Sequence, residues 1–128
     1  AEATVLDKNT VSVAGRQFHT KNLVLATGAR SYLPDIPGLN LPGVFDFASL
    51  IEDLNFEPSR CVIIGGSKIA LEYGSFFQAT GCHTTIVSRS PLMRTASLHH
   101  VDEDIRQYVV ENMRRRGMSI LEQANPIE

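Results

Sequence analysis

Hydrophobic and polar positions follow two different patterns along the chain, and the change falls near residue 60. Before it, short β-branched runs alternate with polar turn residues, which predicts a hairpin of strands at 4–6 and 10–13. A compact apolar run predicts a further strand at 22–26. Residues 31–43 contain three prolines and two glycines, a density that excludes regular structure and predicts a connecting loop. A short helix is predicted over 47–54, ended by Asn55 and Pro58.

From residue 60 onward, apolar β-branched runs alternate with segments of helical periodicity. The predicted elements are a fully buried strand at 61–64, a helix at 68–80, a strand at 83–87, a helix at 102–116 and a strand at 118–121. Helical crossovers of this length imply a parallel sheet. The sequence therefore predicts an α/β fold, with a Rossmann-type βαβαβ sheet over residues 60–121 after a small β-rich segment.

Apolar residues recur at helical spacing within both predicted helices. In the first helix they are Ile69, Tyr73, Phe76 and Phe77, and in the second they are Ile105, Val109 and Met113.

Composition narrows the function classes. The chain has 128 residues, 43% hydrophobic and 20% charged, with a formal charge of -2, as in an ordinary soluble globular protein. This balance gives no reason to expect nucleic acid or an anionic membrane as a partner. No apolar run approaches the roughly 20 residues that cross a bilayer, and no secretory signal is visible. Cys61 and Cys82 match no metal or redox spacing, which predicts core cysteines and a cytoplasmic protein.

Charge is unevenly distributed along the chain. Residues 58–101 contain four basic side chains and one acidic side chain, although the whole chain is acidic. A local basic excess of this size suits a small anionic ligand better than a long polyanion.

A phosphate-binding turn is predicted between the strand at 61–64 and the helix that follows. Gly65, Ser67 and Ala70 occupy the three small-residue positions of the dinucleotide fingerprint. Gly65 permits the tight turn, the small Ser67 lets the backbone approach a pyrophosphate, and Ala70 lets the helix pack closely on the strand. An ordinary tight turn in a domain that binds no nucleotide is the alternative. Lys68 either pairs with Glu72, meets an anion or is solvated.

The loop after the strand at 83–87 favours NADP over NAD. An NAD site usually places a carboxylate there, yet no acidic residue occurs between Tyr73 and Val101. Arg89 and Arg94 lie in the loop instead, and guanidinium is the best partner for a 2′-phosphate. The alternative is that both arginines are simply solvated.

Two blocks of sequence resemble the FAD-dependent pyridine nucleotide-disulfide oxidoreductases, which include glutathione, mercuric and dihydrolipoamide-type reductases. Residues 25–30 (Leu-Ala-Thr-Gly-Ala-Arg) and 33–38 (Leu-Pro-Asp-Ile-Pro-Gly) are similar to the family's ATG motif, and residues 61–89 are similar to its NAD(P) fingerprint. Within the family, residues 65–68 (Gly-Gly-Ser-Lys) and 72–74 (Glu-Tyr-Gly) are most similar to the 2-oxopropyl-coenzyme M reductases (carboxylating).

The resemblance implies three groups of cofactor-binding residues. The pyrophosphate and nicotinamide of NADP would be lined by Gly65, Gly66, Ser67 and Ile69, with Lys68 beside them. The 2′-phosphate would be bound by Ser88, Arg89 and Arg94, and FAD would lie near Ala26, Thr27 and Gly28. Glu72 matches an acidic residue that, in relatives, pairs with a lysine beside the flavin, and that lysine would lie upstream of this chain.

The resemblance also implies a division of labour within a larger, homodimeric flavoenzyme. Residues 1–57 would be the tail of its FAD-binding domain and residues 58–128 part of its NADP-binding domain. NADPH would pass hydride to FAD, which would reduce a cysteine pair outside this chain, and no residue here would be catalytic. The substrate would be a small disulfide or thioether, 2-oxopropyl-coenzyme M being one candidate. A generic reductase of the same family and a nucleotide-binding module without catalysis remain as alternatives.

Overall fold

The computed structural model describes residues 2–52, 57–95 and 98–125. The chain divides into two compact units, residues 1–30 and 31–128. This division reflects contacts within the chain. The boundary predicted at residue 57 instead separates an FAD-binding segment from an NADP-binding segment. That functional assignment of 1–57 and 58–128 stays a prediction.

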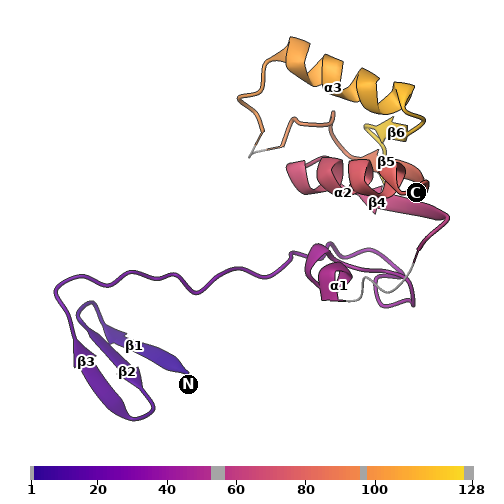
Figure 1. Ribbon diagram of the computed structural model, residues 1–128. Coiled ribbons are helices and arrows are strands. Elements are labelled where there is room, and N and C mark those ends of the chain that lie inside the picture. Colours follow the sequence, from indigo (N-terminus) through magenta and orange to yellow (C-terminus); the bar gives the residue numbers. More distant parts are fainter. Residues whose placement is uncertain (1, 53–56, 96–97, 126–128) are drawn as a thin grey trace. The chain divides into compact units, whose positions relative to one another are not determined.

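The first unit is an antiparallel meander of three strands (Figure 1). Strands β1 (Ala3–Asp7), β2 (Thr10–Val13) and β3 (Arg16–His19) pair in that order. The predicted hairpin is confirmed, and its register places Val5 opposite Val11. The buried Thr10 hydroxyl lies 3.1 Å from Nδ1 of His19, which ties β2 to β3.

The strand predicted at 22–26 is absent, which corrects the sequence prediction. The segment has no regular secondary structure, and Val24 and Leu25 are 85% and 69% exposed. A run of apolar residues becomes a strand only where a neighbouring strand satisfies its backbone groups. Within the described part of the chain, no strand pairs with this segment.

The second unit begins with the loop rich in proline and glycine and continues into helix α1 (Phe47–Glu52). Asp46 and Ser49 cap this helix reciprocally, since the Ser49 N–H donates to Asp46 Oδ1 at 2.7 Å and the Asp46 N–H donates to Ser49 Oγ at 3.0 Å. The hydrogen bonds from Ser49 lower the pKa of Asp46 to about 2. Residues 53–54 and the helix end predicted at Asn55 lie outside the described residues.

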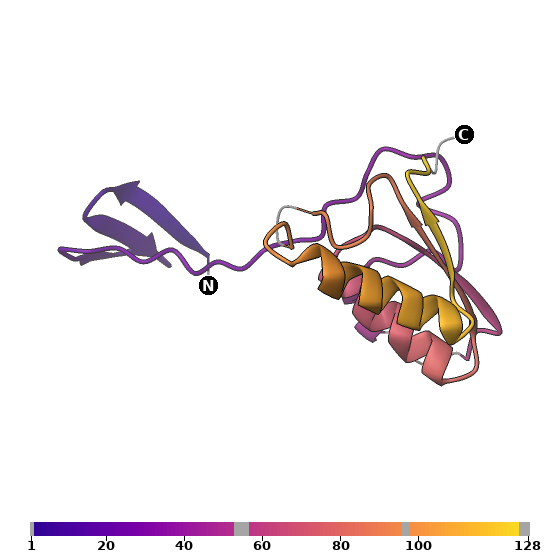
Figure 2. The same cartoon turned by 90° about the horizontal axis from the view of Figure 1, so that it is seen from above.

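The rest of this unit is the predicted βαβαβ arrangement, which confirms the α/β fold class. Its elements are β4 (Arg60–Ile64), α2 (Lys68–Ala79), β5 (His83–Ser88), α3 (Glu103–Arg115) and β6 (Ser119–Glu122). The three strands are parallel and lie in the order β4-β5-β6. Figure 2 shows α2 and α3 side by side along the strands.

The core lies between the sheet and these two helices. A row of isoleucines crosses the sheet in register, with Ile63 opposite Ile86 and Ile86 opposite Ile120. Ile86 is fully buried and packs with Val110 and Met113 of α3. The prediction that the first strand is buried on both faces is wrong for the described residues, because Val62 and Ile64 are 66% and 51% exposed. Side chains alternate between the two faces of a strand, and the described helix contacts bury only the face that carries Ile63.

Only some of the apolar residues that recur at helical spacing are buried, among them Phe77 and Met113. In α2 the buried residues are Ala70, Gly74 and Phe77, whereas Ile69 and Phe76 are 43% and 50% exposed. The small residues face the sheet because a close approach of helix to strand leaves no room for larger ones. In α3 Val110 and Met113 are buried, while Ile105 is exposed. No helix in the described residues is long and apolar enough to cross a membrane.

Candidate functional site at the carboxyl edge of the sheet

The carboxyl ends of all three parallel strands meet at one edge of the sheet. Ile64 pairs with Val87, and Ser88 pairs with Glu122, so the segments that leave β4, β5 and β6 lie next to one another. The glycine turn at 65–67 leaves β4 here and leads directly into α2. Crevices at this edge are where open α/β sheets bind ligands, and helix N-termini there present free N–H groups to anions.

The glycine turn is a tight turn that accepts no side chain at its first two positions. Gly65 has φ +136°, a conformation that L side chains rarely adopt, and its N–H donates to Val87 O at 2.9 Å. A Cβ at Gly66 would lie 2.4 Å from Ser88 Oγ, so any side chain there would collide with the end of β5. Ser67 is extended and makes no side-chain capping bond to α2. The first N–H groups of α2 therefore donate no hydrogen bond to the Ser67 side chain. The backbone at Gly65 and Gly66 carries no side chain that would block a phosphate.

Lys68 and Glu72 lie one turn apart, both exposed, at the start of α2. The Lys68 Nζ is 3.6 Å from Glu72 Oε1, and the two side chains are 72% and 61% exposed. Of the three interpretations that the sequence left open for Lys68, the structure shows the pairing with Glu72. A pair this exposed is worth little energy, about 0.3–0.5 kcal/mol for this helical spacing, so it restrains Lys68 only weakly.

The loop after β5 is bound tightly to the glycine turn. Met93 N–H donates to Gly66 O at 3.0 Å, and Leu92 beside it is fully buried. Ser88 is buried too, and its hydroxyl donates to Ser90 O at 2.7 Å. Arg89, between these anchors, is exposed. The structure therefore presents Arg89 at the surface of a fixed loop, whereas the Ser88 hydroxyl is already hydrogen-bonded inside it.

Arg94 is held within the protein by partners of its own. Its Nη1 donates to Val101 O at 3.2 Å, and its Nη2 forms an ion pair with the carboxylate of Glu103. Arg106 and Arg94 together hold the pKa of Glu103 at about 2, with the hydrogen bond from Arg106 as the largest cause. Within the described residues, no ion pair engages Arg89. Arg89 is thus the more accessible of the two predicted 2′-phosphate ligands, and Arg94 would have to exchange Glu103 for the phosphate.

Three residues at this edge were not identified from the sequence: Leu92, Met93 and Glu122. Met93 has φ +63°, which is rare for a residue with a side chain, and it brings its N–H to the glycine turn. Glu122 ends β6 and accepts a hydrogen bond from Leu92 N–H at 2.7 Å. Glu122 could have been identified from the sequence, because it follows the third predicted parallel strand and the last residues of neighbouring parallel strands lie at one edge of the sheet. No sequence pattern identifies Leu92 or Met93.

The three predicted FAD-contacting residues belong to the first unit. Ala26, Thr27 and Gly28 are all exposed and have no regular secondary structure, and Gly28 has φ +75°. The described residues build no enclosed site around them, so their role in binding FAD stays a prediction.

The two cysteines share the amino-terminal part of the sheet. Both are free thiols, Cys82 buried and Cys61 partly buried. The prediction of a core position is therefore confirmed for Cys82 and holds only in part for Cys61. Burial raises the pKa of the Cys61 thiol, and the neighbouring Cys82 side chain raises it further, although Thr84 acts in the opposite direction.

Cys61 should consequently alkylate slowly. Only the thiolate is nucleophilic, so the raised pKa leaves less reactive sulfur at pH 8 than in a free thiol. The rate of iodoacetamide labelling at Cys61, followed by peptide mass spectrometry against pH, should reach half its maximum above the midpoint of glutathione in the same solution. A midpoint below that of glutathione would contradict this environment for the thiol.

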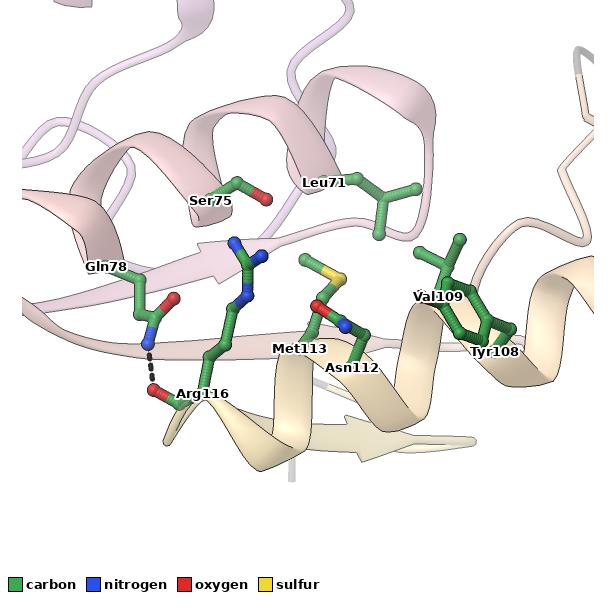
Figure 3. A pocket seen from close by; sticks show the side chains of 8 residues that line it. All are labelled: Leu71, Ser75, Gln78, Tyr108, Val109, Asn112, Met113 and Arg116. Atoms are coloured by element: carbon green, nitrogen blue, oxygen red, sulfur yellow. Dashed lines mark hydrogen bonds between the residues drawn. The ribbon is translucent and has the colours of Figure 1, made fainter.

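A separate hollow of about 300 Å³ lies between α2 and α3 (Figure 3). Leu71 and Met113 line its apolar part, and the Gln78 side-chain amide bonds to the Arg116 carbonyl at one end. None of its lining residues belongs to the predicted nucleotide site.

Comparisons with known proteins identify a family for the whole chain. Residues 1–128 match the family model described as pyridine nucleotide-disulphide oxidoreductase. The mercuric reductase of Bacillus cereus is 32% identical over 120 residues, which cover 94% of this chain and 18% of that protein. The chain thus spans under a fifth of this relative's length.

Two solved structures are similar as well. A Cu(II) complex of the HOCl-induced flavoprotein disulfide reductase RclA from Escherichia coli matches with a TM-score of 0.79 and 28% identity, over 99% of this chain and 28% of that one. An engineered water-forming NADPH oxidase bound to NADPH, derived from the Lactobacillus brevis NADH oxidase, matches with a TM-score of 0.68 and 26% identity. That match covers 93% of this chain and 28% of the oxidase.

Proposed function

Because this chain belongs to the pyridine nucleotide-disulphide oxidoreductase family, we propose that it is the NADPH-docking part of an FAD-dependent disulfide oxidoreductase. The observation that carries this proposal is the carboxyl edge of the sheet. There the glycine turn and the loop carrying Arg89 are hydrogen-bonded to each other, and no acidic residue lies between Tyr73 and Val101.

The residues at this edge fit a dinucleotide phosphate. Gly65, Gly66 and Ser67 would approach the pyrophosphate through their backbone, because no side chain fills the turn. The exposed Arg89 would bind the 2′-phosphate, with Arg94 joining it once released from Glu103. Lys68 and Ile69, both exposed on the first turn of α2, would lie alongside the cofactor. When bound, NADPH would supply the hydride that reduces the flavin.

The engineered NADPH oxidase supports the choice of NADP over NAD. The substitutions made in that NADH oxidase replace an aspartate by alanine and introduce arginine and serine at the next two positions, with another arginine further on. This chain has a small residue, an arginine and a serine in the same order at Ser88, Arg89 and Ser90, with Arg94 downstream. A dianionic phosphate favours this arrangement, since a carboxylate there would repel it.

The rest of the proposed enzyme would lie in a larger protein of which this chain is a part. Residues 1–57 would complete an FAD-binding domain through Ala26, Thr27 and Gly28, and residues 58–128 would form part of the NADP-binding domain. The reducing equivalents would pass from the flavin to a cysteine pair outside this chain, in a homodimer that acts on a small disulfide or thioether. The two free cysteines favour a cytoplasmic location, because closely placed thiols persist in reducing compartments.

The identity of the substrate is a further part of this proposal. Residues 65–68 and 72–74 favour reductive cleavage and carboxylation of 2-oxopropyl-coenzyme M, while the mercuric reductase relative favours a more general disulfide-reductase chemistry. The glycine turn and the Arg89 loop are equally compatible with either substrate, because both chemistries would draw on the same NADPH.

Anaerobic titration of the full-length, flavin-loaded protein tests the proposal. NADPH should bleach the flavin absorbance stoichiometrically, and NADH at the same concentration should do so far more slowly. Binding of NADPH without any flavin reduction would favour the nucleotide-binding module instead. Flavin reduction that is equally fast with both nucleotides would contradict the assignment of Arg89 to a 2′-phosphate.

A further inference from the structure

Glu122 connects the loop after β5, which carries Arg89 and Arg94, to helix α3. It is the last residue of β6 and lies opposite Ser88, the last residue of β5. Its side chain is only 21% exposed although it is a carboxylate. A charged group that is this shielded from water needs close partners, and the structure provides three.

The partners of Glu122 come from two parts of the unit, the loop after β5 and helix α3. Oε1 accepts the backbone N–H of Leu92 at 2.7 Å, and the same oxygen lies 3.1 Å from Nη1 of Arg106. Oε2 lies 3.3 Å from Nη2 of Arg114. The Arg106 side chain is itself only 16% exposed and also pairs with Glu103, the partner of Arg94. One carboxylate therefore joins the loop after β5 to two positions on α3.

The hydrogen bond from Leu92 N–H to Glu122 lies in the loop between Arg89 and Met93, and Met93 in turn binds the glycine turn. Leu92 is fully buried, and the next N–H, that of Met93, donates to Gly66 O of the glycine turn. Two consecutive backbone N–H groups thus fix the loop between the end of β6 and the phosphate-binding turn. Met93 adopts a left-handed conformation to achieve this, which a side chain disfavours and which neighbouring contacts must maintain.

We propose that Glu122 is a positioning residue for cofactor selectivity: by holding Leu92 N–H, it fixes the backbone of the loop that carries Arg89 and thereby supports recognition of the 2′-phosphate. This inference rests on the proposed function. Because Glu122 acts through the loop and not through the glycine turn, its removal affects NADPH, which has the 2′-phosphate, more than NADH, which lacks it.

Two substitutions of Glu122 separate this role from a general effect on stability. Glu122→Gln retains an oxygen that can accept the Leu92 N–H, whereas Glu122→Met has similar length and no such acceptor. In the full-length, flavin-loaded protein we expect Glu122→Met to reduce the ratio of NADPH affinity to NADH affinity about fivefold, the typical net contribution of one hydrogen bond. Glu122→Gln should preserve most of that ratio.

Arg114→Met is the matched control, because it removes one ion pair from Glu122 and leaves the oxygen that binds Leu92 intact. It should not change the ratio. An unchanged ratio in Glu122→Met, whether both affinities fall equally or neither changes, would overturn the inference while leaving the proposed function standing. Wild-type protein that binds neither nucleotide, or both equally, would overturn the two together.

Discussion

Replacing Arg89 by glutamate should weaken NADPH binding to the full-length protein by about 10- to 100-fold while changing NADH binding little. Hydrogen bonds to charged groups contribute roughly 1.5–3 kcal/mol each, and the new carboxylate would in addition repel the 2′-phosphate. Arg89 is exposed on a loop that Leu92 and Met93 anchor independently, so the substitution leaves those anchors in place. Calorimetric titration with each nucleotide measures the effect.

Arg115→Glu is the control for Arg89→Glu. It makes the same change of net charge at an exposed residue in the last turn of α3, within the same unit. It should leave both affinities unchanged within about twofold, because exposed charges farther apart than a Debye length of about 8 Å are largely screened. Equal losses for NADPH and NADH in Arg89→Glu would indicate a disturbed fold and would contradict a specific role in binding the 2′-phosphate.

The second large effect concerns stability. Replacing Ile86 by alanine should destabilise the unit formed by residues 31–128 by about 3–5 kcal/mol, the upper part of the range for such truncations. Ile86 is fully buried at the centre of β5, and an added Cβ at Gly74 would lie only 3.0 Å from its Cδ1. Gly74 has no side chain that could fill the space, so the truncation leaves a cavity. The free energy of unfolding in urea, followed by circular dichroism, measures the loss.

Ile105→Ala removes the same atoms from a residue that is 55% exposed in α3. Its cost should stay within about 1 kcal/mol, because surface substitutions away from special contacts have small effects. Equal losses of stability for the two variants would show that the core is not centred on β5.

Much of the fold could be predicted from the chain because local patterns and long-range packing agree there. The structure contains the strand predicted at 61–64 and the tight turn after it. It also contains the predicted alternation of helices and strands up to residue 121. The run at 22–26 is equally apolar and yet forms no strand in the described residues, because pairing depends on a neighbour that no local pattern provides. Helical spacing also does not determine which side chains of a helix are buried. In α2 Phe77 is buried but Ile69 and Phe76 are exposed, and close packing on the sheet buries the small residues Ala70 and Gly74.

The sequence alone was sufficient to predict the glycine turn, the position of the arginines after the second parallel strand and the absence of acidic residues between Tyr73 and Val101. These depend on residue type at short range, where a missing Cβ or a fixed charge acts whatever surrounds it. The tertiary structure decided which of these groups are available, because that depends on residues distant in the sequence. In the folded protein Arg94 pairs with Glu103, and Arg89 is exposed. Glu122 binds the backbone of the loop that carries both arginines. Parallel strands bring their last residues to one edge, and only folding shows which of those residues bind one another there.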